Sequence, residues 1–322
     1  MTHPLIRTLT QKVLGGRSLT PEEGMALTAL TKEHTLDLLV AAHSIAQAMQ
    51  SRFFTCAIVN AKSGTCSQDC HFCAQSRYYR TSAPTHSLLV LDDLVARGVS
   101  MAQAGARCFS LVTSGLMLTS AEMDTICQCI ALLKKKTSLE ISASLGLLTP
   151  EYAQRLHDAG LTRYHHNVET ARSYFPAICS THSYDQDLET IALAQEFGLK
   201  VCCGGILGLG ESWEQRVELA GTLADLQVDT VPLNFLVPIP GTPLERQQLL
   251  SVHDALKSVA LFRFFLPNTN ITIAGGREQV LGDYQSWLFL AGANGMMIGN
   301  YLTTQGRDLS KDQRMLEQGQ WI

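Results

Sequence analysis

The sequence of 322 residues has no apolar run that approaches the roughly 18 residues a helix needs to cross a bilayer. It also has no charged-then-apolar targeting pattern at its N-terminus. The formal net charge is −4, so there is no broad basic excess of the kind that nucleic-acid binding requires. We therefore expect a cytoplasmic protein that neither crosses a membrane nor binds nucleic acid.

Cysteine, in contrast, is plentiful, with ten residues in the chain. Without a secretory leader, this number argues against a secreted disulfide framework and favours metal binding in a reducing compartment. Apolar residues make up 46% of the sequence. This content is ample for the core of one large domain, or of a domain with an appendage.

The most informative stretch is 64–76, where Cys66, Cys70 and Cys73 form a C-x3-C-x2-C pattern directly after an apolar run. Three thiolates on one short loop suit an iron–sulfur cluster, because they hold three corners of a cubane and leave the fourth iron open. A zinc loop and a pair of structural thiols are the alternatives. Zinc sites usually contain paired C-x2-C units, and the sequence has no second unit of this kind.

Residues 1–50 have the pattern of helices, with a helix start at 20–23 (TPEE). Beyond them, short apolar runs alternate with helix-sized segments, which is typical of an α/β fold of the (β/α)8 TIM-barrel type. A doubly wound open sheet is the alternative. The candidate strands are 53–59, 107–113, 139–145, 163–168, 200–206, 231–237, 270–274 and 295–298. We predict an N-terminal helical cap (1–50), a barrel (51–305) and a C-terminal tail (306–322).

The cysteine loop directly follows the first predicted strand. In a barrel of this type, functional groups lie at the C-terminal ends of the strands. The predicted position of the loop therefore agrees with its chemistry, and this agreement favours an iron–sulfur cluster over zinc.

Several motifs resemble, in the same order, those of the biotin synthase-like branch of the radical S-adenosylmethionine (SAM) superfamily. The resemblance extends from about residue 53 to about residue 300 and so covers most of the chain. It is carried by 67–76 (SQDCHFCAQS), 166–170 (HNVET), 200–206 (KVCCGGI), 208–211 (GLGE), 231–234 (VPLN) and 276–279 (GREQ). The resemblance implies a [4Fe-4S] cluster on Cys66, Cys70 and Cys73, whose open iron binds SAM and whose electron cleaves it to a 5′-deoxyadenosyl radical.

The resemblance also implies which residues contact the cofactor and the substrate. Asn167 and Asn234 fall where the family binds dethiobiotin, and Asn234 would hydrogen-bond its ureido ring. The expected SAM contacts are Phe72, Gln75, Thr113, Asn167, Glu169, Gly205 and Ile206. On residue type alone, 204–211 is also compatible with a tight turn, and Asn234 with a polar residue in a barrel layer. A dinucleotide fingerprint is excluded, since it would need glycine at Trp213.

The auxiliary cluster is where the chain departs most from the pattern of the family that it resembles. The family holds an auxiliary [2Fe-2S] cluster with three cysteines and one arginine. Of these positions only Cys202 keeps a cysteine, and the others are Ser110, Ser142 and Thr272. We therefore expect a variant with altered auxiliary-cluster ligands.

Other cysteines can replace the missing ligands. Cys56, Cys108 and Cys202 lie on the first, second and fifth predicted strands at similar depth, and alternation turns Cys108 the same way as Ser110. Because the interior of an eight-stranded barrel is only as wide as its side chains, we predict a rebuilt auxiliary cluster on these three cysteines. A four-iron cluster that carries a sulfide is favoured, and [2Fe-2S] is the alternative. The other interpretation is three buried, apolar-like thiols; Cys179 is a further candidate ligand, at a different depth.

The resemblance implies a sulfurtransferase that inserts sulfur into dethiobiotin to form biotin, with no catalytic residue beyond the cluster ligands. The alternatives are another enzyme of the same branch, for example in hydrogenase maturation, and a non-enzymatic iron–sulfur scaffold. The family also implies a reduced flavodoxin- or ferredoxin-type electron donor and a homodimer. Where the family has a basic residue for the SAM carboxylate, this chain has Asp187. We expect Arg172 or another base to compensate.

Overall fold

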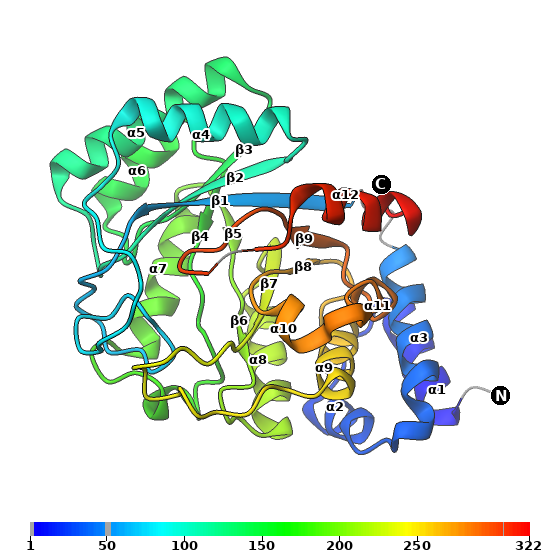
Figure 1. Ribbon diagram of the computed structural model, residues 1–322. Coiled ribbons are helices and arrows are strands. Elements are labelled where there is room, and N and C mark those ends of the chain that lie inside the picture. Colours follow the sequence, from blue (N-terminus) through cyan, green and yellow to red (C-terminus); the bar gives the residue numbers. More distant parts are fainter. Residues whose placement is uncertain (1–2, 49–52, 305) are drawn as a thin grey trace.

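The computed structural model describes residues 3–48, 53–304 and 306–322. Its strands form one parallel sheet in the order β5-β4-β3-β2-β1-β9-β8-β7-β6, and a further pairing of β5 with β7 closes the ring (Figure 1). The strands are β1 (Phe54–Lys62), β2 (Cys108–Thr113), β3 (Glu140–Ser144), β4 (Arg163–His165), β5 (Lys200–Cys202), β6 (Gly205–Leu207), β7 (Thr230–Phe235), β8 (Asn270–Ile273) and β9 (Gly295–Met297). The closed ring confirms the TIM-type barrel and excludes the doubly wound sheet.

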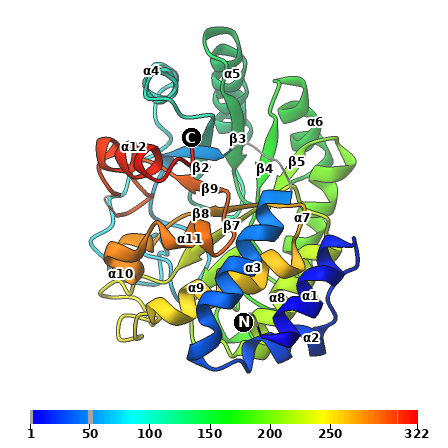
Figure 2. The same ribbon diagram turned by 90° about the vertical axis from the view of Figure 1, so that its right-hand side faces the viewer.

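Helices surround this barrel. The helices are α1 (Pro4–Leu14), α2 (Pro21–Thr28), α3 (Thr35–Ala48), α4 (Leu91–Gln103), α5 (Ser120–Lys136), α6 (Pro150–Asp158), α7 (Tyr184–Glu196), α8 (Trp213–Asp225), α9 (Val252–Phe265), α10 (Arg277–Leu281), α11 (Trp287–Leu290) and α12 (Leu309–Gln318). Three short 3-10 turns are η1 (Lys32–His34), η2 (Phe175–Ala177) and η3 (Gly282–Tyr284). The N-terminal extension packs on the outer layer, with α2 against α8 and α3 against α9 (Figure 2).

The prediction of one strand over 200–206 is wrong, because this strand is broken into β5 and β6. Opposite the break lies Pro232 of β7, which has no N–H to donate to the ladder. A Cβ on Gly204 would lie only 2.0 Å from the carbonyl oxygen of Pro232. The missing donor and this close approach explain why the pairing is interrupted after Cys202 and resumes at Gly205.

Strand β1 shows how the sequence directs side chains toward or away from the barrel interior. Its residues alternate strictly between buried and partly exposed positions. Ala57 and Val59 belong to the core between strands and helices, whereas Cys56 and Ile58 line an interior cavity. This period-2 alternation is what brings a cysteine into the barrel.

The segment predicted as a tail, 306–322, contains α12, which is attached to the barrel by a buried ion pair. Arg277 Nη2 donates to Asp312 Oδ2 at 2.7 Å, and the side chains are 2% and 1% exposed. Glu278 lies 3.4 Å from the same guanidinium. The predicted domain boundaries, after residues 50 and 305, fall at residues outside the described parts of the chain.

We predict that Asp312→Ala lowers the free energy of unfolding by about 3 kcal/mol, because it leaves the buried guanidinium of Arg277 with less compensating charge. Urea unfolding followed by circular dichroism measures this change. The control is Glu317→Ala, which removes an exposed carboxylate from the same helix. Equal effects of the two substitutions would show that the buried pair does not hold α12 in place.

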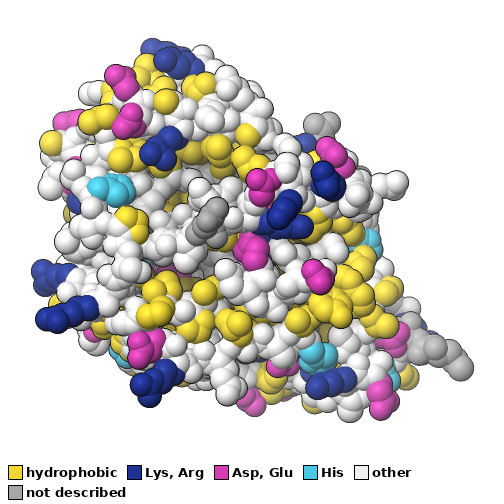
Figure 3. Space-filling model, in the orientation of Figure 1, with side chains coloured by type: hydrophobic (Ala, Val, Ile, Leu, Met, Phe, Trp, Pro, Cys, Tyr) yellow, Lys and Arg dark blue, Asp and Glu magenta, His cyan; other side chains and the backbone are white. Residues whose placement is uncertain are grey.

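No helix in the described part of the chain combines the length and hydrophobicity that a bilayer crossing requires. On the face shown in Figure 3, acidic and basic side chains are interspersed.

Candidate active site

The cysteine loop follows β1, and hydrogen bonds across its base hold its shape. The N–H of Cys66 donates to the carbonyl of Gln75 at 2.9 Å. The side-chain oxygen of Gln75 accepts from the N–H of Gly64 at 3.3 Å and from the hydroxyl of Ser63 at 3.0 Å. The three cysteines of the loop are therefore presented together at the C-terminal end of the barrel, where the sequence predicts them.

Two thiols of this loop, Cys70 and Cys73, lie where an uncompensated thiolate is unfavourable. Burial raises the pKa of Cys73 to about 11, against hydrogen bonds from the backbone. The pKa of Cys70 is raised as well, first by a hydrogen bond with Cys179 and then by burial. A bound cation would offset these costs, so the donor set fits an iron–sulfur cluster.

A further group of metal-ligating side chains adjoins the loop. Cys179 Sγ lies 3.8 Å from Cys70 Sγ and 3.2 Å from His182 Nδ1, and the ligand atoms of all three lie within 4.8 Å of one another. The carboxylate of Asp69 fixes this segment by accepting from Cys179 Sγ at 3.3 Å and from the N–H of Ser180 at 2.9 Å. Cys179 is thus close to the cysteine loop and not to the cysteines deep in the barrel.

Asp187 is buried in contact with two histidines. Its Oδ1 lies 2.8 Å from His166 Nε2 and 3.5 Å from His182 Nε2. Burial lowers the pKa of His182, but hydrogen bonds, first that with Asp187, outweigh burial and raise it to about 10. His182 is therefore protonated at neutral pH. Arg172, the base expected to compensate for Asp187, instead pairs with Asp185 at 2.7 Å and is half-exposed.

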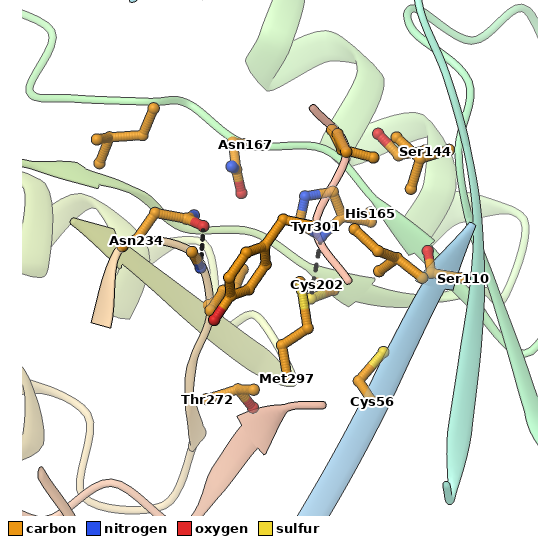
Figure 4. Close-up of a pocket in the computed structure, with 18 of the residues that line it drawn as sticks. Cys56, Ser110, Ser144, His165, Asn167, Cys202, Asn234, Thr272, Met297 and Tyr301 are labelled. Atoms are coloured by element: carbon orange, nitrogen blue, oxygen red, sulfur yellow. Dashed lines mark hydrogen bonds between the residues drawn. The ribbon is translucent and has the colours of Figure 1, made fainter. Parts of the chain in front are cut away.

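The barrel encloses a cavity of about 340 Å³ that begins beside the cysteine loop and extends to residues deep in the strands (Figure 4). The predicted site residues that line it are Phe72, Asn167, Glu169, Ile206, Asn234, Cys56, Cys108 and Cys202. Three other predicted SAM contacts, Gln75, Thr113 and Gly205, are not among its lining residues. Gln75 instead stabilises the cysteine loop through its side-chain hydrogen bonds. Most of the predicted site is therefore brought together in one space.

A tight crossing of two segments shapes one wall of the cavity. Asn167 accepts from the N–H of Gly204 at 3.1 Å and donates to Glu169 Oε2 at 3.2 Å. Glu169 has a φ of 61°, a strained value for a residue with a side chain. A Cβ on Gly205 would lie 2.4 Å from the carbonyl oxygen of Glu169. Glycine is therefore required at 205 to let the two backbones pass.

Asn234 reaches the cavity from β7 with half of its hydrogen-bonding capacity in use. Its Oδ1 accepts from the N–H of Gly275 at 3.0 Å (Figure 4). Its Nδ2 donates to the carbonyl of Gly205 at 3.3 Å. A side-chain amide has two donors and two acceptor sites. One N–H and one lone pair of this fixed amide therefore remain for a ligand.

Three cysteines line the cavity far from the cysteine loop, and we call Cys56, Cys108 and Cys202 the deep cysteines. The first two are register partners on β1 and β2. A hydrogen bond with Cys56, followed by burial, raises the pKa of Cys108. Burial raises the pKa of Cys202 to about 12, and its Sγ lies 3.3 Å from His165 Nδ1. The family-pattern positions Ser110, Ser142 and Thr272 line the same cavity.

Sequence reasoning missed several side chains of this cavity, and two of them bear on its chemistry. Tyr301 lines it after β9 and donates its hydroxyl to the carboxylate of Glu278 at 3.0 Å. The GREQ motif was a usable signal for this contact, since Glu278 belongs to it. Arg163, at the start of β4, lines the cavity beside the deep cysteines. Nothing in its sequence context distinguishes it from a surface arginine at a strand start.

Comparison with known proteins extends the resemblance to the whole chain. Residues 61–223 match the Radical SAM superfamily, and 232–321 match the Biotin and Thiamin Synthesis associated domain. The chain is 50% identical over 297 residues to the biotin synthase of Oleidesulfovibrio alaskensis, covering 92% of each protein. It is 48% identical over 317 residues to that of Syntrophus aciditrophicus, covering 98% of each.

Among solved structures, methylornithine synthase superposes with a TM-score of 0.83 at 20% identity, covering 97% of this chain and 96% of that one. The FeFe-hydrogenase maturase of Carboxydothermus hydrogenoformans superposes with a TM-score of 0.81 at 19% identity, covering 98% and 78%. These two likenesses show the barrel fold. The extent and identity of the sequence matches show that the chain belongs to the biotin synthase family of radical SAM enzymes.

Proposed function

We propose that this chain is a radical SAM sulfurtransferase that converts dethiobiotin to biotin. The observation that carries the proposal is a single cavity that begins at Phe72 of the cysteine loop and is lined by both Asn234 and the deep cysteines. Cys202 is level with Thr230 in the sheet, whereas Asn234 lies four residues farther along β7, about 13 Å toward the loop. A substrate held at Asn234 would therefore lie between the loop and the deep thiols.

The cysteine loop would hold the [4Fe-4S] cluster through Cys66, Cys70 and Cys73. Held there and reduced, such a cluster would supply the electron needed to break the sulfur–C5′ bond of SAM. The proposed SAM contacts are Phe72, Gln75, Thr113, Asn167, Glu169, Gly205 and Ile206. Four of them line the cavity, and Gly205 lets its wall close against Glu169. These residues would hold the adenosyl group against the substrate and exclude water from the space between them.

Asn167 and Asn234 are the proposed dethiobiotin contacts. The ureido ring of dethiobiotin presents a carbonyl acceptor beside N–H donors. The amide of Asn234 retains one N–H and one lone pair and is held rigidly by Gly205 and Gly275. Such a donor–acceptor pair complements one edge of a cyclic urea, and the mainly apolar remainder of the cavity suits the hydrocarbon part of the substrate.

We predict that Asn234→Asp raises the KM for dethiobiotin about 10- to 100-fold, because the carboxylate cannot donate to the ureido carbonyl and a buried unpaired group costs about 1–3 kcal/mol. Steady-state kinetics over a range of dethiobiotin concentrations measures the change. Asn268→Asp, the same substitution outside the cavity, is the control. An unchanged KM in Asn234→Asp would remove this residue from the substrate site.

The deep cysteines are the proposed ligands of the auxiliary cluster, and a cluster sulfide is the proposed source of sulfur. Three thiols that share one cavity fit such a group, because metal binding would remove the cost of the raised pKa values of Cys108 and Cys202. Three protein thiolates suit a four-iron cluster that carries a sulfide on its last iron, and a [2Fe-2S] cluster is the alternative.

The experiment that tests the function uses anaerobically reconstituted, reduced protein with SAM and dethiobiotin. The proposal requires both 5′-deoxyadenosine and biotin; 5′-deoxyadenosine without biotin would indicate a different substrate, and neither product would indicate a scaffold. Hydrogenase maturation is not favoured, since the maturase shares only the fold, at 19% identity. A reduced flavodoxin- or ferredoxin-type donor, a homodimer and a cytoplasmic location complete the proposal.

A further inference from the structure

Arg163 lies where the cavity of the deep cysteines meets a second pocket. Its side chain lines the cavity together with all three deep cysteines. It also lines a pocket at the N-terminal ends of the strands, which includes Lys200, Asp229 and Asn270. The residue itself is only 4% exposed. A buried guanidinium thus forms the boundary between the inner end of the cavity and the opposite face of the barrel.

The contacts of this guanidinium leave one of its nitrogen atoms, Nε, without a partner among the described residues. Its Nη1 donates to Thr230 Oγ1, and its Nη2 donates to Glu140 Oε2 at 3.0 Å. Its Cζ lies 5.3 Å from the ring centroid of Phe54, which packs against the guanidinium. Its Nε is buried and has no hydrogen-bond partner among the described residues. Because buried charged donors are almost always satisfied, this N–H indicates a partner that belongs in the cavity.

The strand register identifies the chemistry of that partner. Arg163 donates to Thr230, which is the register partner of Cys202. It also donates to Glu140, which is the register partner of Cys108. Glu140, its ion-pair partner, is 40% exposed and so lies toward solvent. The fixed positive charge and its free N–H are therefore associated with the thiols, which identifies sulfur as the class of acceptor.

We propose that Arg163 donates its Nε hydrogen to a sulfur of the metal group held by the deep cysteines and that its charge offsets the negative charge of that group. This inference depends on the auxiliary cluster proposed above and assigns Arg163 as a positioning residue. Hydrogen bonds to cluster sulfurs and nearby positive charge are established determinants of reduction potential. Arg163 would therefore raise the potential of the auxiliary cluster and retain its sulfide.

Lysine and methionine at this position separate the two contributions. Lysine keeps the charge but not the planar set of N–H donors, whereas methionine removes both. The parent protein is the full chain with Cys66, Cys70 and Cys73 replaced by alanine, so that only the auxiliary cluster contributes a signal. Arg107→Lys, at an exposed arginine just before β2, is the matched control.

The readouts are iron and acid-labile sulfide per chain, and the midpoint potential from a redox titration followed by electron paramagnetic resonance. We expect Arg163→Lys to keep the iron of the parent but to show a more negative potential. Arg163→Met should show a larger negative shift and lose part of its sulfide, and Arg107→Lys should match the parent. Because Arg163→Met removes a buried charge, its folding is checked by comparing its circular dichroism spectrum with that of the parent. If Arg163→Met does not fold, the result for Arg163→Lys tests the inference.

Two results would overturn the inference, and they differ in what else they overturn. In the first, the parent contains iron, and a folded Arg163→Lys variant has the same potential and sulfide content as the parent. This result would overturn the role of Arg163 alone. A parent without iron after reconstitution would overturn the auxiliary cluster itself, and the role of Arg163 with it.

Discussion

Replacing any one of Cys66, Cys70 and Cys73 by alanine is expected to abolish SAM cleavage and to remove the [4Fe-4S] cluster. The three thiols lie on one short loop, and its surroundings raise the pKa values of Cys70 and Cys73. These two thiols gain little as free thiolates, and binding cationic iron would offset that cost. With only two thiolates left, the loop cannot bind three irons of a cubane and leave the fourth iron open.

This loss is measured as 5′-deoxyadenosine formed per chain and as iron content after anaerobic reconstitution. Cys127→Ala is the matched control, since this thiol lies on α5, where it hydrogen-bonds to the carbonyl of Arg155. A Cys66→Ala or Cys73→Ala protein that still cleaves SAM at the rate of the Cys127→Ala protein would refute the assignment of the loop.

Alanine at any one of the deep cysteines is expected to separate the two halves of the reaction. SAM cleavage should continue, because the cysteine loop is intact, but biotin formation should fall to background, because the proposed sulfur source is lost. Cys56→Ala and Cys108→Ala remove partners that face each other across β1 and β2, and Cys202→Ala removes the thiol on β5. All three should lose auxiliary iron and sulfide.

Mössbauer spectra, iron and sulfide analysis, and parallel assays of 5′-deoxyadenosine and biotin measure this separation. Cys203→Ala is the control, because the neighbouring thiol is buried in the core and is absent from the cavity lining. Auxiliary iron that is unchanged in all three deep-cysteine variants would end the proposal of a rebuilt cluster and leave these residues as core thiols.

Much of the fold could be predicted because it depends on local pattern. Alternation along β1 predicts which residues face inward, and it correctly turns Cys56 to the interior. The break between β5 and β6 could not be predicted in the same way. It depends on Pro232 and Gly204, which are distant in sequence and meet only when β7 is in place.

The candidate site likewise contains residues that could be predicted from the sequence and residues that could not. The cysteine loop and Asn234 could be predicted, since each belongs to a short local motif. The environment of Asp187 could not be predicted, because its two histidines come from different segments. The hydrogen bond with Asp187 is the first of the interactions that raise the pKa of His182. Arg163 is the clearest case: its unpartnered Nε and the nearby thiols become visible only when β2, β4 and β5 are side by side.

The most direct test of the account follows hydrogen from the substrate to the cofactor. Dethiobiotin deuterated at the two carbons that receive sulfur is incubated with reconstituted, reduced protein and SAM, and the 5′-deoxyadenosine is analysed by mass spectrometry. If a substrate held at Asn234 lies between the cysteine loop and the deep cysteines, deuterium must appear in 5′-deoxyadenosine as biotin accumulates. Biotin formed with unlabelled 5′-deoxyadenosine, or SAM cleaved without any transfer of deuterium, would contradict the account.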